Sequence, residues 1–157
     1  MKAGDVVFFE GKGLIGRLIQ KLTGSPYSHV ALAVDSESII EADRFIRTRI
    51  TILPEENRVA VMRVSPELSE KETASLVLYA KTMIGRKYDY ANIFTWFIRL
   101  VFQWNRFKLV DNANRLYCSE LIDRAYQDAL NIDLCPDRQE GDVTPSQLFT
   151  SNMLKLV

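Results

Sequence analysis

Hydrophobic residues in the first half of the chain come in short runs separated by turn-forming residues, which is the pattern of β-strands. Five runs predict strands, at residues 5–10, 28–34, 39–43, 47–52 and 59–64. Between the first two, apolar residues from Leu14 to Leu22 recur at helical spacing, and Thr23-Gly24-Ser25-Pro26 ends this short helix. The first half therefore predicts a run of antiparallel strands.

The second half has the period of helices instead. Ser69 and Glu72 stand in capping-box spacing and open a helix whose apolar positions run to Met83, before Gly85 ends it. The remaining segments are a loop at 85–90, an aromatic-rich segment at 91–104, a helix from Cys118, a helix start at 144–149 and a terminal strand at 154–157. Strands first and helices afterwards indicate the α+β class, and we expect residues 1–157 to form a single domain.

Composition and charge narrow the class of protein. The 157 residues suffice for one domain with a useful core, and 47% hydrophobic and 25% charged residues are ordinary for a globular protein. Twenty basic and twenty acidic residues cancel, so charge favours no nucleic acid partner and no anionic surface. The first residues run straight into a strand-like stretch and not into a secretory signal. We therefore expect a cytoplasmic protein without stable membrane insertion, and the sequence does not indicate its oligomeric state.

Cys118 begins the helix that carries the candidate chemistry. From this residue on, apolar side chains between Leu121 and Tyr126 recur at helical spacing. Cys118 therefore lies in the first turn, where unpaired backbone N–H groups and the helix dipole favour a negative charge. A thiol in this position ionises more easily, and the thiolate is the nucleophile. Such a nucleophile needs a base, and the chain contains one histidine, His29.

His29 and Glu41 fall on consecutive predicted strands. If the connection is the three-residue loop Asp35-Ser36-Glu37, Glu41 opposes Ala31 and His29 becomes its diagonal neighbour on the same face of the sheet. The carboxylate would then hold one imidazole nitrogen and leave the other to take a proton from a thiol. A loop with an even number of residues would separate the two side chains, so the register is open at this point.

Each of these residues also has a structural interpretation. A lone strand histidine can bond a backbone carbonyl, a free cysteine commonly packs as a small hydrophobe, and a strand glutamate can be an edge charge. Cys135 has no visible base, and a disulfide between it and Cys118 is disfavoured in a reducing compartment. Glu120 is interpreted as a structural residue that pairs with an arginine.

Five segments together resemble a known family. They are Gly4-Asp5-Val6-Val7, Ser28-His29-Val30-Ala31-Leu32, Ile40-Glu41-Ala42, Gly85-Arg86-Lys87-Tyr88-Asp89-Tyr90 and Tyr117-Cys118-Ser119-Glu120-Leu121. In this order they resemble the YiiX-like permuted papain-fold amidases. That family is a circularly permuted branch of the NlpC-type cell-wall peptidases, and the lecithin:retinol acyltransferase-like enzymes are a related permuted group. In the unpermuted relatives the cysteine helix precedes the histidine hairpin, whereas here the histidine comes first.

The resemblance implies a permuted papain-like (NlpC-type) fold, with a small antiparallel sheet or barrel packed against helices. It implies that Cys118 is the nucleophile, His29 the general base and Glu41 the residue that orients the imidazole. The implied activity is that of a cysteine peptidase or amidase, which hydrolyses an amide through an acyl-enzyme intermediate. Its partner would be a peptide, a peptidoglycan fragment or an acyl-containing small substrate.

The resemblance leaves several points open. Tyr88 is similar in position to a tyrosine that helps bind the oxyanion in the unpermuted relatives, and Tyr90 and Tyr117 are alternatives for this role. A lipid acyltransferase or a thioesterase would use the same three residues on an ester or thioester. A non-catalytic binding module would keep the fold and leave Cys118 unreactive.

We expect neither a metal nor a cofactor. One histidine and two distant cysteines do not supply the usual ligand sets, and Gly11-Lys12-Gly13 lacks the length and the ending of a phosphate loop. The aromatic segment at 91–104 is too short and too charged to span a bilayer. We interpret it as a core helix or a flap covered by residues 70–83 and 144–157, and the alternative is a surface that admits an acyl chain or touches a membrane.

Overall fold

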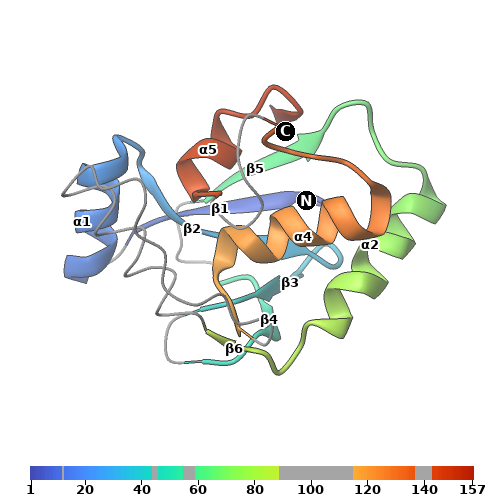
Figure 1. Ribbon diagram of the computed structural model, residues 1–157, viewed down its shortest axis with the longest axis horizontal. Helices are drawn as coiled ribbons and strands as arrows, with labels where there is room; N and C mark the ends of the chain where they lie inside the picture. Colours follow the sequence, from blue (N-terminus) through green and yellow to red (C-terminus); the bar gives the residue numbers. More distant parts are fainter. Residues whose placement is uncertain (12, 44–45, 55–58, 89–114, 137–142) are drawn as a thin grey trace.

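The computed structural model describes residues 1–157 except for 12, 44–45, 55–58, 89–114 and 137–142. Its centre is a six-stranded antiparallel sheet in the order β4-β3-β2-β1-β5-β8. The strands are β1 (Val6–Glu10), β2 (Tyr27–Ala33), β3 (Ser38–Glu41), β4 (Arg49–Ile52), β5 (Val59–Val64) and β8 (Leu154–Leu156). The sheet is open, with β4 and β8 at its edges, so the structure has the sheet and not the barrel (Figure 1).

The helices lie where the periodicity predicts them. They are α1 (Gly13–Thr23), α2 (Glu70–Thr82), α4 (Cys118–Leu130) and α5 (Pro145–Phe149). The capping box before α2 is present, because the Ser69 hydroxyl accepts from the Glu72 N–H at 3.3 Å and the Glu72 carboxylate accepts from the Ser69 N–H at 2.8 Å. α4 packs across β2, and α2 lies against α4 (Figure 1). Among the residues that the structure describes, no helix is long and apolar enough to cross a bilayer.

The segment predicted as a loop at 85–90 contains a short strand. β6 (Lys87–Tyr88) pairs in parallel with β7 (Arg115–Leu116). This pairing joins segments that are far apart in the sequence, so the local pattern of residues 85–90 does not indicate it. The aromatic segment at 91–104 lies outside the described residues, and its interpretation stays a prediction.

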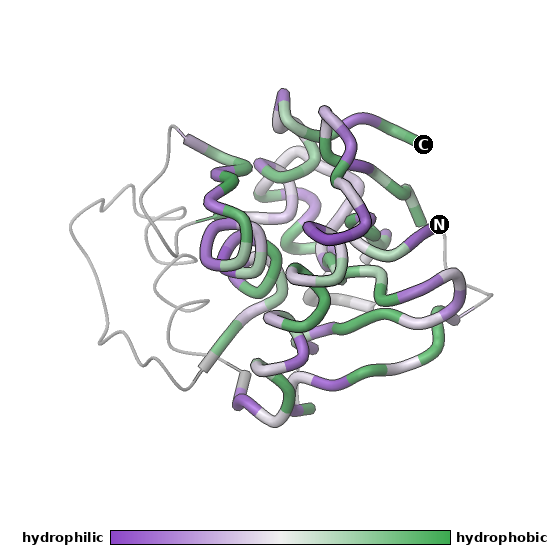
Figure 2. The backbone as a smooth tube through the Cα atoms, turned by 90° about the vertical axis from the view of Figure 1, so that its right-hand side faces the viewer, coloured by the Kyte–Doolittle hydropathy of each residue, from purple (hydrophilic) through white to green (hydrophobic). Residues whose placement is uncertain are grey.

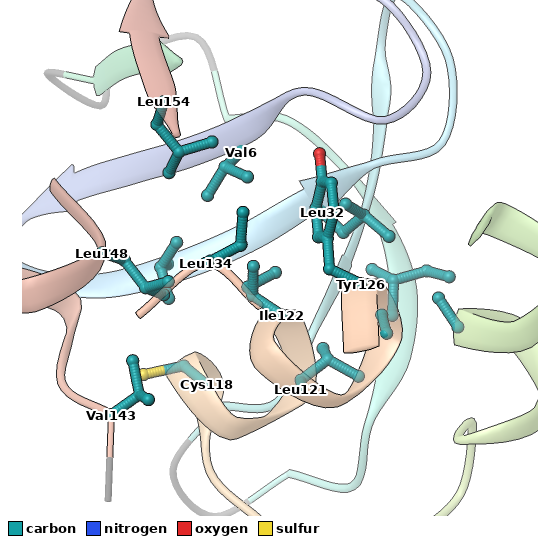
Figure 3. Packing of buried hydrophobic residues seen from close by; sticks show 14 of the residues in the cluster. Val6, Leu32, Cys118, Leu121, Ile122, Tyr126, Leu134, Val143, Leu148 and Leu154 are labelled. Atoms are coloured by element: carbon teal, nitrogen blue, oxygen red, sulfur yellow. The ribbon is translucent and has the colours of Figure 1, made fainter. Parts of the chain in front are cut away.

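The two faces of the sheet bury different sets of side chains. The face toward the helices carries the larger core, in which Val6, Val30 and Leu32 pack against apolar residues of α2, α4 and α5 (Figure 3). The opposite face buries a smaller cluster, made of Val7, Phe9, Ala31, Ala33 and Ile39. Successive strand residues point to opposite faces, which explains why these strands are apolar throughout instead of alternating.

The hairpin of β2 and β3 has the register that the three-residue loop predicts. Leu32 pairs with Ile40 and Ala33 with Ile39, and the Val34 N–H donates to the Ser38 carbonyl at 2.8 Å. The Asp35 carboxylate accepts from the backbone N–H of Ser38 at 2.7 Å, which fixes the turn. The loop therefore holds an odd number of residues, which places His29 and Glu41 on the same face of the sheet.

Both ends of the chain belong to the same side of the sheet. β8 pairs with β5, which pairs with β1, and the Val157 N–H donates to the Val61 carbonyl at 3.0 Å. The N- and C-termini lie close together in both views of the backbone (Figures 1 and 2). The first and last strands therefore share one half of the sheet, and the β2–β3–β4 half carries the residues described next.

Candidate active site

His29 lies in β2 and is held on three sides. Its Nε2 is 3.2 Å from Oε2 of Glu41, and its interaction with the Cys118 side chain raises the pKa of the imidazole. Because Nε2 faces Glu41, Nδ1 is the ring nitrogen left for the thiol. The Phe9 ring packs against the imidazole with 5.4 Å between ring centroids. The side chain retains 20% exposure, so the ring is fixed in place and still accessible.

The backbone beside His29 is irregular in a way that sets its position. The pairing of β1 with β2 shifts between Phe9, which faces His29, and Glu10, which faces Tyr27. Such bulges often redirect side chains next to active sites. The adjoining α1 packs very closely, because a Cβ on Gly11 would lie 2.5 Å from Oγ of Ser28 and 2.8 Å from the backbone of Gly16. Position 11 therefore has no room for a side chain between α1 and Ser28, the residue before His29.

Cys118 is the first residue of α4 and is 5% exposed. The preceding residue, Tyr117, has extended dihedrals and no side-chain capping bond, and its carbonyl accepts the intrahelical bond from the Leu121 N–H at 3.0 Å. The N–H groups before Leu121 belong to the open first turn of the helix. The sulfur points toward Val143, whose carbonyl accepts a 2.6 Å hydrogen bond from the Ser119 hydroxyl (Figure 3). The segment before α5 is thus fastened to the start of α4.

Glu41 connects the histidine to an arginine on the next strand. The carboxylate is 8% exposed, and its Oε1 accepts from Nε and Nη2 of Arg49 at 3.1 and 2.9 Å. The other oxygen, Oε2, faces His29. Glu41 and Arg49 are direct cross-strand partners of β3 and β4. Arg49 thus interacts with Glu41, Glu41 with His29, and His29 with Cys118.

The electrostatics favour an ionised pair of His29 and Glu41. Burial by itself lowers the pKa of His29, but the hydrogen bonds with Cys118 and Glu41, together with the charges of Cys118 and Asp43, outweigh it and raise the pKa from 6.5 to about 10. Burial raises the pKa of Glu41, and the hydrogen bonds and charges of His29 and Arg49 more than offset this, so that the pKa lies below its usual value. Both pKa shifts favour the charged forms, an imidazolium beside a carboxylate.

The other residues singled out in the sequence have different surroundings. Cys135 is 9% exposed and lines a pocket of about 280 Å³ with residues of the C-terminal tail, whereas the one histidine of the chain bonds to Cys118. Glu120 is buried and pairs with Arg124 one turn along α4 at 2.7 Å, as predicted for a structural residue. The backbone of Tyr88 pairs with Leu116, two residues before Cys118, and the side chain of Tyr88 lies outside what the structure describes.

Arg49 is the residue that the sequence analysis missed. It falls in the predicted strand at 47–52, directly after the strand of Glu41, and oppositely charged residues on neighbouring strands are a known cross-strand pair. The predicted strands at 39–43 and 47–52 leave three residues between them, and no register is predicted from this connection. In the structure β3 ends at Glu41 and β4 begins at Arg49, and their register pairs these two residues directly.

Comparisons with known proteins show the family of the chain. The sequence pattern of the family described as permuted papain-like amidase enzyme, YaeF/YiiX, C92 family, matches residues 1–157. The chain is 25% identical over 138 residues to the uncharacterized protein YiiX of Escherichia coli (strain K12), which covers 83% of this chain and 60% of that protein. The chain thus matches about 60% of the length of this curated relative.

A solved structure shares the fold. The crystal structure of the metalloprotein yiiX from Escherichia coli O157:H7 superposes with a TM-score of 0.75 at 23% identity, over 99% of this chain and 96% of that chain. In the described part of the present chain, no group of three or more His, Cys, Asp or Glu side chains comes together as a metal ligand set. The match along the whole sequence and the shared fold lead to one conclusion: the chain belongs to the permuted papain-like amidase family.

Proposed function

We propose that this protein is a thiol-dependent hydrolase that cleaves an amide bond in a peptide or a peptidoglycan-like substrate, with Cys118 as nucleophile, His29 as acid and base, and Glu41 as the orienting residue. One observation carries the proposal. The one histidine of the chain is hydrogen-bonded to a buried carboxylate, and it also interacts with the cysteine that begins α4. This is the order of a nucleophile, a base and an orienting group.

The raised pKa of His29 supports a charged resting state. In the proposed reaction the thiolate of Cys118 is the nucleophilic form. Glu41 stabilises the imidazolium and fixes its ring, because its Oε2 lies 3.2 Å from Nε2. The proton that the leaving amine needs is then already on His29 when the substrate binds.

The reaction follows from these charges. The Cys118 thiolate attacks the amide carbon, a C–S bond forms, and the carbonyl oxygen becomes an oxyanion. His29 donates its proton to the amide nitrogen, the C–N bond breaks, and the amine leaves. A water molecule then gives a proton to the neutral His29 as its oxygen attacks the thioester, and the C–S bond breaks to return the thiolate and the imidazolium.

The oxyanion needs hydrogen-bond donors in fixed positions. The backbone N–H groups of the first turn of α4 supply such donors, because Tyr117 does not cap the helix with its side chain. Their surroundings are buried, since Cys118, Ser119 and Glu120 are each at most 5% exposed. We also propose that Tyr88 supports the oxyanion, since its backbone pairs with β7 two residues before Cys118.

A substrate panel tests the proposal. The panel holds matched amide, ester and thioester compounds with peptide, γ-glutamyl and fatty acyl groups, and mass spectrometry detects the acyl adduct on the enzyme. We expect turnover of amides and an adduct on the peptide that contains Cys118. Cys118→Ala should abolish the adduct, and the matched control Cys135→Ser should keep both adduct and turnover.

Other outcomes would replace the proposal with one of its alternatives. Turnover confined to fatty acyl esters or thioesters would indicate a lipid acyltransferase or thioesterase that uses the same site. An adduct on Cys135, or no adduct with any compound while the protein still binds a panel member, would contradict the role of Cys118 and favour a binding module.

A further inference from the structure

Arg49 forms hydrogen bonds to Glu41, the carboxylate that contacts His29. Its Nε and Nη2 both donate to Oε1 of Glu41, at 3.1 and 2.9 Å, while Oε2 of the same carboxylate is left for His29 at 3.2 Å. We propose that Arg49 is a positioning residue of the active site, which keeps Glu41 ionised and keeps one of its oxygens directed at the imidazole. This inference rests on the proposed function, because it assigns Arg49 a part in that reaction.

The contact is built into the sheet. Glu41 and Arg49 are paired by the register of β3 and β4, and Ile40 and Ile39 pair with Ile50 and Thr51 in the same ladder. Cross-strand partners keep their Cβ atoms about 5 Å apart, so the two side chains meet whenever β4 is paired. A guanidinium that gives two donors to one oxygen holds the position of that oxygen more firmly than a single bond would.

The buried carboxylate needs this cation. Glu41 is 8% exposed, and burial of a carboxyl group favours its neutral form. A neutral Glu41 would no longer stabilise an imidazolium. The Arg49 side chain is 45% exposed, so it remains hydrated while its fork reaches inward to Glu41.

The catalytic cycle gives Arg49 a role that His29 cannot fill. His29 loses its charge when it protonates the leaving amine, and at that stage Glu41 has lost one of its two cationic partners. Arg49 keeps its charge throughout, because the guanidinium of arginine does not titrate in the working range. Glu41 therefore remains an anion and is ready to stabilise the imidazolium that forms again during hydrolysis of the thioester.

The groups that can influence the titration of Glu41 and His29 come from several elements. The pKa of Glu41 depends on His29 of β2 and on Arg49 of β4. The pKa of His29 depends in addition on Cys118 of α4 and on Asp43, which follows β3. Removing Arg49 should let Glu41 take up a proton at a higher pH. The acid limb of the pH–rate profile should then move to higher pH, and so should the acid-side inflection in the chemical shift of His29.

The experiment compares Arg49→Gln with Arg49→Lys and with Arg47→Gln. Arg47 is the matched control, because it loses the same charge two positions earlier and donates to the Gly85 carbonyl instead of to Glu41. For Arg49→Gln we expect kcat/KM to fall roughly 10- to 100-fold, with the acid limb displaced upward. Arg49→Lys should restore the acid limb, since it restores the charge, and Arg47→Gln should leave it unchanged.

NMR of the single histidine separates this inference from the proposed function, because it needs no substrate. If the enzyme turns over no panel compound, the proposed function fails, and the His29 titration still tests the role of Arg49. An acid-side inflection that is the same in wild type and Arg49→Gln would overturn the inference. Loss of turnover without any change in this titration would also overturn it, because it would indicate a substrate contact or a general structural role.

A double variant guards against misfolding of Arg49→Gln. In Glu41→Gln/Arg49→Gln position 41 no longer holds a buried carboxylate that needs a cation, so the fold is not put at risk by an unpaired charge there. If Arg49 acts through Glu41, the double variant should have the kcat/KM of Glu41→Gln alone. Losses that multiply would show that Arg49 acts independently of Glu41 and would overturn the inference.

Discussion

The sheet holds two carboxylate–arginine pairs that use the same groups differently. Asp5 at the start of β1 is 1% exposed, and Arg63 of β5 donates to both of its oxygens, with Nε at 2.7 Å from Oδ1 and Nη2 at 3.0 Å from Oδ2. In the half of the sheet that carries the site, Arg49 donates twice to a single oxygen of Glu41. The other oxygen of Glu41 faces His29.

The difference separates a structural pair from a working one. In the fork of Asp5 and Arg63 both carboxylate oxygens are used to join β1 to β5, and the Lys2 N–H adds a third bond at 2.8 Å. The hydrogen bond to Asp5 is the main reason why the pKa of Arg63 is raised. Glu41 has instead one oxygen fixed by an arginine and one in contact with a group whose charge changes in the proposed reaction. The partner of the second oxygen, and not burial, distinguishes the two carboxylates.

The largest expected effect is the loss of turnover when the thiol or the base is removed. Cys118→Ala and His29→Ala should each reduce kcat/KM by about 10⁴-fold or more on the best amide of the panel, because no other histidine can replace the base. Circular dichroism should show that both variants are folded. Turnover of His29→Ala within tenfold of wild type would contradict the assignment of the base.

Replacing each carboxylate by its amide sharpens the comparison. Glu41→Gln should lower kcat/KM by about 10²- to 10⁴-fold and leave measurable activity, since an amide can still contact the ring but cannot balance an imidazolium. Asp5→Asn makes the same chemical change in the other pair, and its kcat/KM should stay within a few-fold of wild type below the unfolding transition. Equal losses of activity in the two variants would remove the distinction between the pairs.

Asp5→Asn should change the stability of the fold, although it should hardly change the activity. Asp5→Asn should lower the free energy of unfolding by about 3 kcal/mol, because it removes the buried counterion of Arg63 and leaves that guanidinium with the exposed Glu67 at 3.4 Å. Urea unfolding at neutral pH measures this change, and Arg63→Met in the same background is the control. A change in the double variant equal to the sum of the two single changes would show that the residues are not coupled.

The smallest effect is a shift in a titration curve. The His29 resonance should have a midpoint of about 10 in wild type, and the midpoint should fall in Cys118→Ala and Glu41→Gln and stay the same in Asp5→Asn. Because folding raises this pKa from 6.5 to about 10, the stabilisation from protonated His29 is complete below about 6.5 and is lost as the pH rises through about 10. A wild-type midpoint near 6.5 would contradict the charged resting state.

The sequence predicts those parts of the site that depend on local rules. The helical period places Cys118 at the first position of α4, and the three-residue loop after Val34 sets the register that lets His29 reach Glu41. Both features arise within a stretch of a dozen residues. The α+β class, the capping box and the terminal strand follow from the same kind of pattern.

What the sequence does not predict depends on contacts over longer distances. The pairing of Arg49 with Glu41 crosses a seven-residue connection, and the short strands β6 and β7 come from segments almost thirty residues apart. The bond from the Ser119 hydroxyl to the Val143 carbonyl joins α4 to the tail in the same way. No register is predicted for the first of these contacts, and the other two join segments far apart along the chain, where local patterns do not specify a partner.

The close approach of Gly11 and Gly16 has a consequence for how the protein tolerates sequence variation. A single methyl group at position 11 would come within 3 Å of three atoms, and one at position 16 would meet the Gly11 Cα at 2.9 Å. In a library that varies every position, substitutions of these two glycines should therefore be depleted as strongly as substitutions of His29 and Glu41, although glycine carries no reactive group. Selection on this protein would then constrain the closely packed positions next to β2 as well as the residues with reactive side chains.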